Sequence, residues 1–231
     1  MRRSGLAACA VPVLLALANL ACAEQVGRTT FELPAGGWQR LASHEHALVF
    51  DQGQTTLPLF SAAYVLPGSG TEVRALLVVT SSDAGLPGRV RWVSEPCAPA
   101  RPRYFTDDYG TNTQPQRRDC LVVNSAFAPS LYFAKDDWLL TALRERQWSL
   151  PKGGISLRSV VGTTNGGLLR VNLVTRKGFA GQPPGPMPGR DLHDVAPELV
   201  AWGMSLHDAV HEGALSARGT LTLPAMSFAA E

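Results

Sequence analysis

The chain of 231 residues has almost no excess charge of either sign. Its 21 Lys and Arg stand against 19 Asp and Glu, and charged residues make up only 17% of the sequence. Proteins that bind nucleic acid or anionic membrane surfaces depend on a surplus of basic side chains. The charge balance therefore argues against both kinds of partner.

Cysteine is also scarce, with four copies that fall into two groups by position. Cys9 and Cys22 lie in an apolar leader, so only Cys97 and Cys120 stay in the chain when the leader is removed. Redox motifs place cysteines two residues apart and zinc thiolates come in close pairs, and neither spacing occurs here. We therefore predict a structural disulfide between Cys97 and Cys120, worth roughly 3 kcal/mol through loop-closure entropy.

Several motifs of enzymes are missing. The sequence contains no Gly-x-Ser-x-Gly, no glycine-rich phosphate loop leading into a helix, and no EF-hand spacing around Asp107 and Asp108. Gly68-Ser69-Gly70 and Gly166-Gly167 are better explained as turns. No cofactor is predicted from these patterns.

A long apolar run occurs only at the start of the chain. Arg2 and Arg3 precede an apolar stretch over residues 6–20, and Ala21-Cys22-Ala23 supplies small residues where signal peptidase cleaves. This order is typical of a secretory signal peptide, and the stretch is shorter than the ~20 residues of a membrane-spanning helix. We predict a cleaved signal peptide over 1–23 and a single periplasmic or secreted domain over 24–231.

A lipoprotein anchored through Cys22 is the alternative for the same leader, although Asn19 stands where a lipobox prefers leucine. Cleavage removes two of the 21 basic residues and leaves 19, equal to the 19 acidic ones, so the mature chain would have no formal net charge. No later segment is apolar enough to span a bilayer, so we expect no transmembrane segment after cleavage.

Alternating apolar residues bounded by turn signals predict strands through most of the chain. The expected strands cover 38–41, 46–51, 56–66, 72–82, 89–94, 120–127, 155–160, 168–176 and 220–223. Residues 136–146 and about 194–215 have the helical period instead, and Asn165-Gly166 favours a tight hairpin turn. The predicted fold is α+β, with an antiparallel sheet of about eight strands and both helices packed on it. A β-sandwich with helical additions is the alternative.

Residues 178–190, GFAGQPPGPMPGR, form the stretch richest in helix and strand breakers. They contain four prolines and four glycines. Proline lacks the backbone N–H that a helix interior or a central strand requires. We expect a connector here, within the single predicted domain.

His207 and His211 are four residues apart on the second predicted helix, which puts both on one side of it. They flank its apolar stripe, and Asp208 follows His207 where a zinc protease has glutamate. A catalytic zinc also needs three protein ligands. We interpret the pair as a solvent-exposed helix flank without metal. The alternative is a metal-dependent hydrolase with His193, or His44 and His46 from one strand face, completing the site.

The predicted disulfide loop, residues 97–120, has the most unusual surface composition and is called the recognition loop below. Its three aromatic side chains lie between two pairs of arginines, and this combination is enriched at recognition surfaces. We predict an exported, non-catalytic binding module that contacts a protein or envelope component through this loop. The residues expected to bind are Arg101, Arg103, Tyr104 and Tyr109. The alternative for the loop is that Phe105 enters the core and the charges only keep it solvated.

Overall fold

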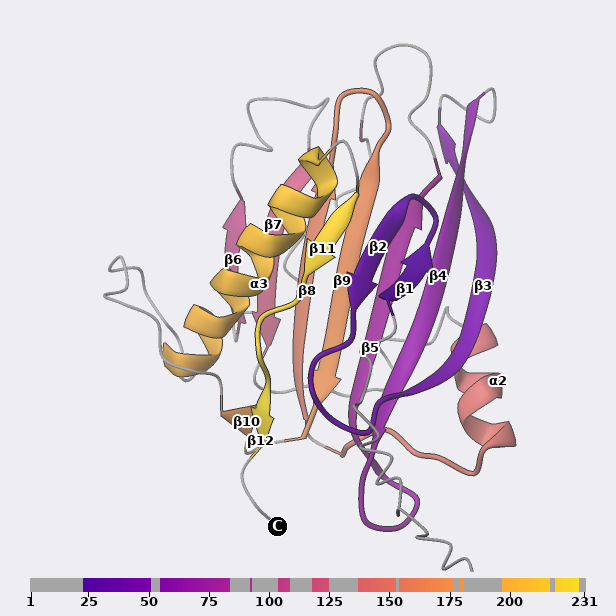
Figure 1. The fold of residues 1–231 in the computed structure, drawn as a ribbon, viewed down its shortest axis with the longest axis vertical. Helices are drawn as coiled ribbons and strands as arrows, with labels where there is room; N and C mark the ends of the chain where they lie inside the picture. Colours follow the sequence, from indigo (N-terminus) through magenta and orange to yellow (C-terminus); the bar gives the residue numbers. More distant parts are fainter. Residues whose placement is uncertain are drawn as a thin grey trace, which may run out of the picture.

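Seven strands form one antiparallel sheet in the computed structural model (Figure 1). The structure describes residues 23–50, 55–83, 92, 104–108, 118–124, 137–152, 154–176, 179–180, 197–216 and 219–228. Across the sheet the strands are β3 (Gln39–Phe50), β4 (Thr55–Pro67), β5 (Val73–Ser82), β9 (Leu168–Thr175), β8 (Ile155–Gly162), β7 (Arg118–Asn124) and β6 (Tyr104–Asp108). Every neighbouring pair in this sheet is antiparallel.

A second layer covers one face of this sheet (Figure 1). Helix α3 (Pro197–Leu215) contacts β7, β8 and β9. Beside it lies a small sheet of β1 (Ala23–Val26), β2 (Thr29–Glu32) and β11 (Thr220–Thr222), in which β2 and β11 are parallel. A short pair, β10 (Phe179–Ala180) and β12 (Ser227–Phe228), completes the described strands.

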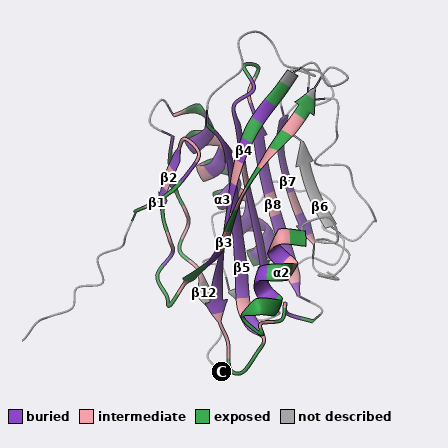
Figure 2. Ribbon diagram, turned by 90° about the vertical axis from the view of Figure 1, so that its right-hand side faces the viewer, coloured by how far each residue is buried: buried purple, intermediate pink, exposed green. Residues whose placement is uncertain are grey.

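Helix α2 (Asp137–Glu145) lies on the opposite face of the seven-stranded sheet and contacts β3 (Figure 2). The alternation of side chains along β4 and β5 divides the core between the two faces. Tyr64 and Leu77 pack beneath the α3 layer, whereas Val65 and Leu76 pack with Leu139 of α2. Because both faces are covered, the central strands are almost continuously apolar.

The structure confirms the predicted α+β class, with both helices packed on an antiparallel sheet. The predicted hairpin turn is present, and Gly166 adopts the positive φ of 81° that glycine tolerates best. The two strands predicted over 38–41 and 46–51 are one continuous strand, β3. The hairpin β1–β2 and the parallel pair β2–β11 have no counterpart among the predictions.

Some predicted segments lie mainly outside the described residues. Of the predicted strand 89–94 the structure describes only Trp92, and of the connector 178–190 only the two residues of β10. In the part of the chain that is described, no helix is long and apolar enough to cross a membrane.

Candidate functional site

The two histidines of α3 meet a buried carboxylate of the sheet. His207 Nε2 lies 2.9 Å from Asp119 Oδ1, and His211 Nδ1 lies 3.0 Å from Asp119 Oδ2. Ser159 Oγ lies 2.7 Å from the other ring nitrogen of His207, Nδ1. Asp119, Ser159 and His207 are buried, while the side chain of His211 is 33% exposed. We call these four residues the α3 polar cluster.

Strand register places the two sheet residues of this cluster under the helix. Asp119 of β7 pairs with Val161 of β8, and Ser159 pairs with Leu121. Leu121 and Val161 belong to the core beneath α3, and side chains two residues apart share a face of a strand. Asp119 and Ser159 therefore project into the same layer as α3.

The interpretation of His207 as a solvent-exposed flank residue is wrong, because His207 is only 2% exposed. The cause is a close approach of α3 to the sheet at Gly203. A Cβ atom there would lie 3.0 Å from Leu157 Cδ2 and 3.1 Å from Val123 Cγ2. His207 and His211 follow Gly203 at four-residue steps, so this side of α3 rests on β7 and β8. His211 keeps part of the predicted solvent contact.

Asp119 and Ser159 belong to no sequence motif and were not among the predicted site residues. The available signal was an acidic residue directly before the apolar strand segment CLVV. A carboxylate whose strand position faces the core must find a partner, because burying an unpaired charge is expensive. The identity of the partner depends on how α3 crosses the sheet, which spacing in the sequence does not reveal.

The order of groups in the α3 polar cluster resembles the carboxylate, imidazole and hydroxyl chain of serine hydrolases. His207 Nε2 faces the Asp119 carboxylate within ion-pair distance, and His207 Nδ1 shares a hydrogen bond with the Ser159 hydroxyl. In the hydrolases the serine contacts Nε2 instead. Ser159 is also fully buried beneath α3, so a substrate carbonyl has no access to its hydroxyl. The cluster therefore pairs buried polar groups and attaches α3 to the sheet.

The predicted alternative of a metal site gains no third ligand from the described residues. Among them, no group of three or more His, Cys, Asp or Glu is arranged to hold a metal ion. His193 lies outside these residues. His44 and His46 do share one face of β3, as predicted, with ring centroids 5.5 Å apart. However, His44 stacks on Trp138 of α2, on the face opposite α3. Strands β3 and β8 are four strand spacings apart, a distance of about 19 Å at ~4.8 Å per spacing. His44 and His46 therefore lie far from His207, which contacts β8.

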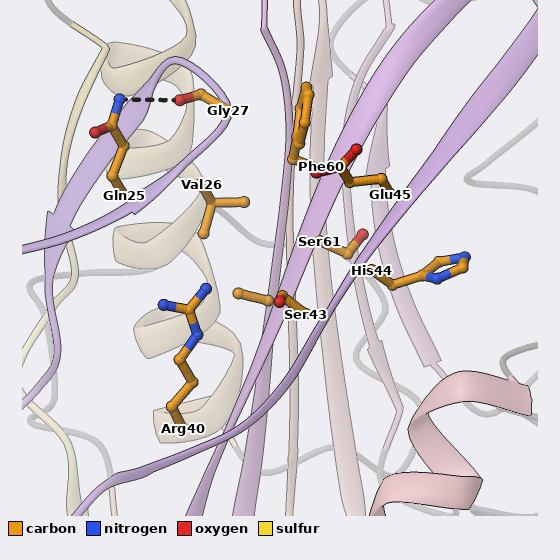
Figure 3. A pocket seen from close by; sticks show the side chains of 10 residues that line it. Gln25, Val26, Gly27, Arg40, Ser43, His44, Glu45, Phe60 and Ser61 are labelled. Atoms are coloured by element: carbon orange, nitrogen blue, oxygen red, sulfur yellow. Dashed lines mark hydrogen bonds between the residues drawn. The ribbon is translucent and has the colours of Figure 1, made fainter.

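A polar pocket of about 250 Å³ lies between β1 and the outer strands β3 and β4 (Figure 3). Arg40 lines it, and its Nη1 lies 3.5 Å from Glu24 Oε2. The hydroxyl of Tyr64 donates to the same carboxylate oxygen at 2.8 Å. Glu45 adds a second acid, and Figure 3 shows His44 pointing away from Arg40, toward the side of α2. With charges of both signs, this lining indicates no single class of ligand.

The predicted binding residues fall only partly within the described chain. Tyr104 is the first residue of β6, the terminal strand of the seven-stranded sheet, and pairs with Asn124 of β7. Arg101, Arg103 and Tyr109 lie outside the described residues. Within the part that is described, β6 pairs only with β7, so its outer edge has no strand partner there.

Cys120 anchors one end of the recognition loop in the sheet. It is fully buried in β7 and packs in a core cluster with Trp92 and Val160. It is disulfide-bonded. Cys97 lies outside the described residues, so its pairing with Cys120 stays a prediction.

Comparison with protein-family models, curated proteins and solved structures finds no match for this chain. Its function must therefore be inferred from the residues and their geometry.

Proposed function

We propose that the chain is an exported, non-catalytic binding module that contacts a protein or envelope component through the recognition loop. The observation that carries this proposal is the position of Tyr104, which begins β6 at the edge of the seven-stranded sheet. A sheet edge offers backbone donors and acceptors to an extended segment of a partner. Neighbouring aromatic and arginine side chains would add specificity and most of the binding free energy.

The α3 polar cluster supports a binding role over hydrolysis. Ser159 has no exposed surface, so it is poorly placed to attack a substrate. Both ring nitrogens of His207 already contact a partner, so a metal ion there would have to displace Asp119 or Ser159. The predicted hydrolase alternative, based on His207 and His211, therefore has no observation in its favour among the described residues.

Export belongs to the same proposal and rests on the leader over residues 1–23. Mass spectrometry of the protein from its native host should find Glu24 as the first residue, without free thiols before reduction. A chain that begins at a lipid-modified Cys22 would establish the membrane-anchored alternative. A chain that retains Met1 would contradict export.

Capture from an envelope extract tests the recognition loop. The triple variant Arg101→Ala, Arg103→Ala and Tyr104→Ala should bind the partner more than about tenfold more weakly. Truncation of a single hot-spot residue already costs ~2 kcal/mol or more of binding free energy. The charge-matched control Arg144→Ala plus Arg146→Ala changes two exposed arginines at the end of α2. It should capture as much partner as the unmodified protein. Both variants should keep the unmodified melting temperature. Capture that survives in the loop variant, or falls equally in the control, would contradict the proposal.

A further inference from the structure

A groove of about 560 Å³ runs beside the C-terminal end of α2. Its volume falls in the range of small-molecule sites, roughly 300–1,000 Å³. Its lining is mainly apolar, with two cationic side chains. The apolar residues are Leu140, Leu143, Trp148 and Leu150, and the cations are Arg144 and Lys152.

The end of α2 fixes one wall of this groove. Gln147 has a positive φ of 55°, and its N–H donates to the carbonyl of Arg144 at 3.0 Å. The N–H of Trp148 donates to the carbonyl of Leu143 at 2.9 Å. These two bonds are those of a Schellman motif, which brings the residue after the left-handed position back against the last helical turn. The indole of Trp148 is thereby held near Leu143, which is 3% exposed.

The segment after Trp148 is attached to the sheet. Ser149 donates its N–H to the carbonyl of Thr71 at 2.8 Å and accepts from the N–H of Val73 at 3.0 Å. Its hydroxyl also contacts the Thr71 carbonyl at 3.4 Å. Both walls are therefore formed before a ligand arrives, which reduces the conformational entropy lost on binding.

The described charges that line the groove have one sign. Arg144 and Lys152 are exposed, and none of the described residues that line the groove is acidic. The guanidinium of Arg144 is held along the helix by bonds to the Leu140 carbonyl at 3.2 Å and to Thr141 Oγ1 at 3.0 Å. A guanidinium has five N–H donors, so these two bonds leave donors for a ligand. Arg146 adds a third cation, 5.8 Å from the ring centroid of Trp148.

We propose that this groove binds a single-chain anionic amphiphile. Its alkyl chain would lie on the leucines and on Trp148, and its acid group would lie beside Arg144 and Lys152. An apolar floor alone would accept any alkyl chain, but the two cations select an acidic headgroup over a neutral or cationic one. The groove adjoins α2, which contacts β3 at one end of the sheet, whereas Tyr104 begins β6 at the other end. The groove therefore shares no described residue with the proposed partner surface.

Titration with laurate below its micelle concentration tests the proposal, with bromoundecanoate as a quencher of nearby tryptophan. Laurate should bind saturably with one site per chain. The brominated acid should quench fluorescence in the unmodified protein, and much less in Trp148→Phe, which lacks the reporting indole. Dodecyltrimethylammonium, which has the same chain length and the opposite charge, should bind at least about tenfold more weakly.

Charge reversal provides the second test. Arg144→Glu plus Lys152→Glu should lower the affinity for laurate by about tenfold or more and raise the affinity for the cationic amphiphile. Thr220→Glu plus Thr222→Glu adds negative charge at two exposed positions of β11, on the side of the sheet opposite α2, and is the control that should leave laurate binding unchanged. Circular dichroism and melting temperature verify folding. If the reversed variant does not fold, Arg144→Gln plus Lys152→Gln should show the same loss with a smaller magnitude.

Four results would overturn the proposal. The first is an absence of saturable laurate binding, as expected if the groove accepts only an acidic peptide. The second is equal affinity for the two amphiphiles, and the third is undiminished quenching in Trp148→Phe. The fourth is a dimer that Arg144→Glu plus Lys152→Glu dissociates, because a second copy of the chain would then occupy the groove.

Discussion

The imidazole of His207 lies 2.9 Å from the carboxylate of Asp119, and each side chain is only 2% exposed. This contact joins α3 to β7 through a buried pair. Removing one partner of a buried pair leaves the other without compensation, which typically costs about 3–5 kcal/mol. We therefore expect the stability of the α3 layer to be sensitive to this contact.

Replacement of Asp119 by alanine should lower the free energy of unfolding by about 3–5 kcal/mol, measured by denaturant titration. A double-mutant cycle with His207→Ala should show that the two losses are not additive. Asp208→Ala, on the exposed side of the same helix, should change stability by less than about 0.5 kcal/mol. A loss below about 1 kcal/mol for Asp119→Ala would show that the pair contributes little.

Replacement of Ser159 by alanine separates a structural role from a catalytic one. The change removes the hydroxyl that contacts His207 Nδ1 and leaves that nitrogen buried, so stability should fall by about 1–3 kcal/mol. Capture of the envelope partner should stay unchanged at a temperature where the variant is folded. A hydrolytic activity of the unmodified protein that disappears in Ser159→Ala would contradict the assignment of this cluster to structure.

Local patterns predicted the parts of the fold that depend on local chemistry. Helix α2 was predicted because Asp137 and Arg144 suit its two ends and its leucines follow the helical period. The hairpin at Asn165-Gly166 and the shared face of His44 and His46 follow from the backbone preference of glycine and the two-residue period of a strand.

Contacts between segments that are far apart in the sequence could not be predicted from local patterns. The parallel pairing of β2 with β11 joins the two ends of the chain. The burial of His207 depends on the close approach at Gly203, which a helical wheel of apolar residues does not represent. The groove at α2 depends on a reversal at Gln147, a residue type without a strong turn preference.

Tyr64 should resist ionisation. Burial, and then the hydrogen bond to the Glu24 carboxylate, raise the pKa of its phenol well above the usual 10.0. A raised pKa in the folded state favours the neutral form, so its contribution to stability is complete below about pH 10 and is lost as pH rises above that. Tyrosinate absorbance of the unmodified protein minus that of Tyr64→Phe should therefore show no ionisation near pH 10 while the fold persists. Glu24→Gln should move this ionisation to lower pH. A difference curve centred near pH 10 in the folded protein would contradict the buried hydrogen bond.

Gln147 should be a site where glycine stabilises the protein. Its φ of 55° is the left-handed conformation, which costs a residue with a Cβ atom roughly 1–2 kcal/mol. Gln147→Gly should therefore raise the free energy of unfolding by about 0.5–1 kcal/mol, after the entropy that glycine adds to the unfolded chain. Gln147→Val should lower it, because branching at Cβ makes the same conformation harder to adopt.

Gln39→Gly, at an exposed position of β3, is the matched control and should lower the free energy of unfolding by about 0.5–1 kcal/mol. Denaturant unfolding of the three variants measures the signs, and equal losses for the two glycine variants would show that Gln147 does not hold the left-handed turn that forms the groove.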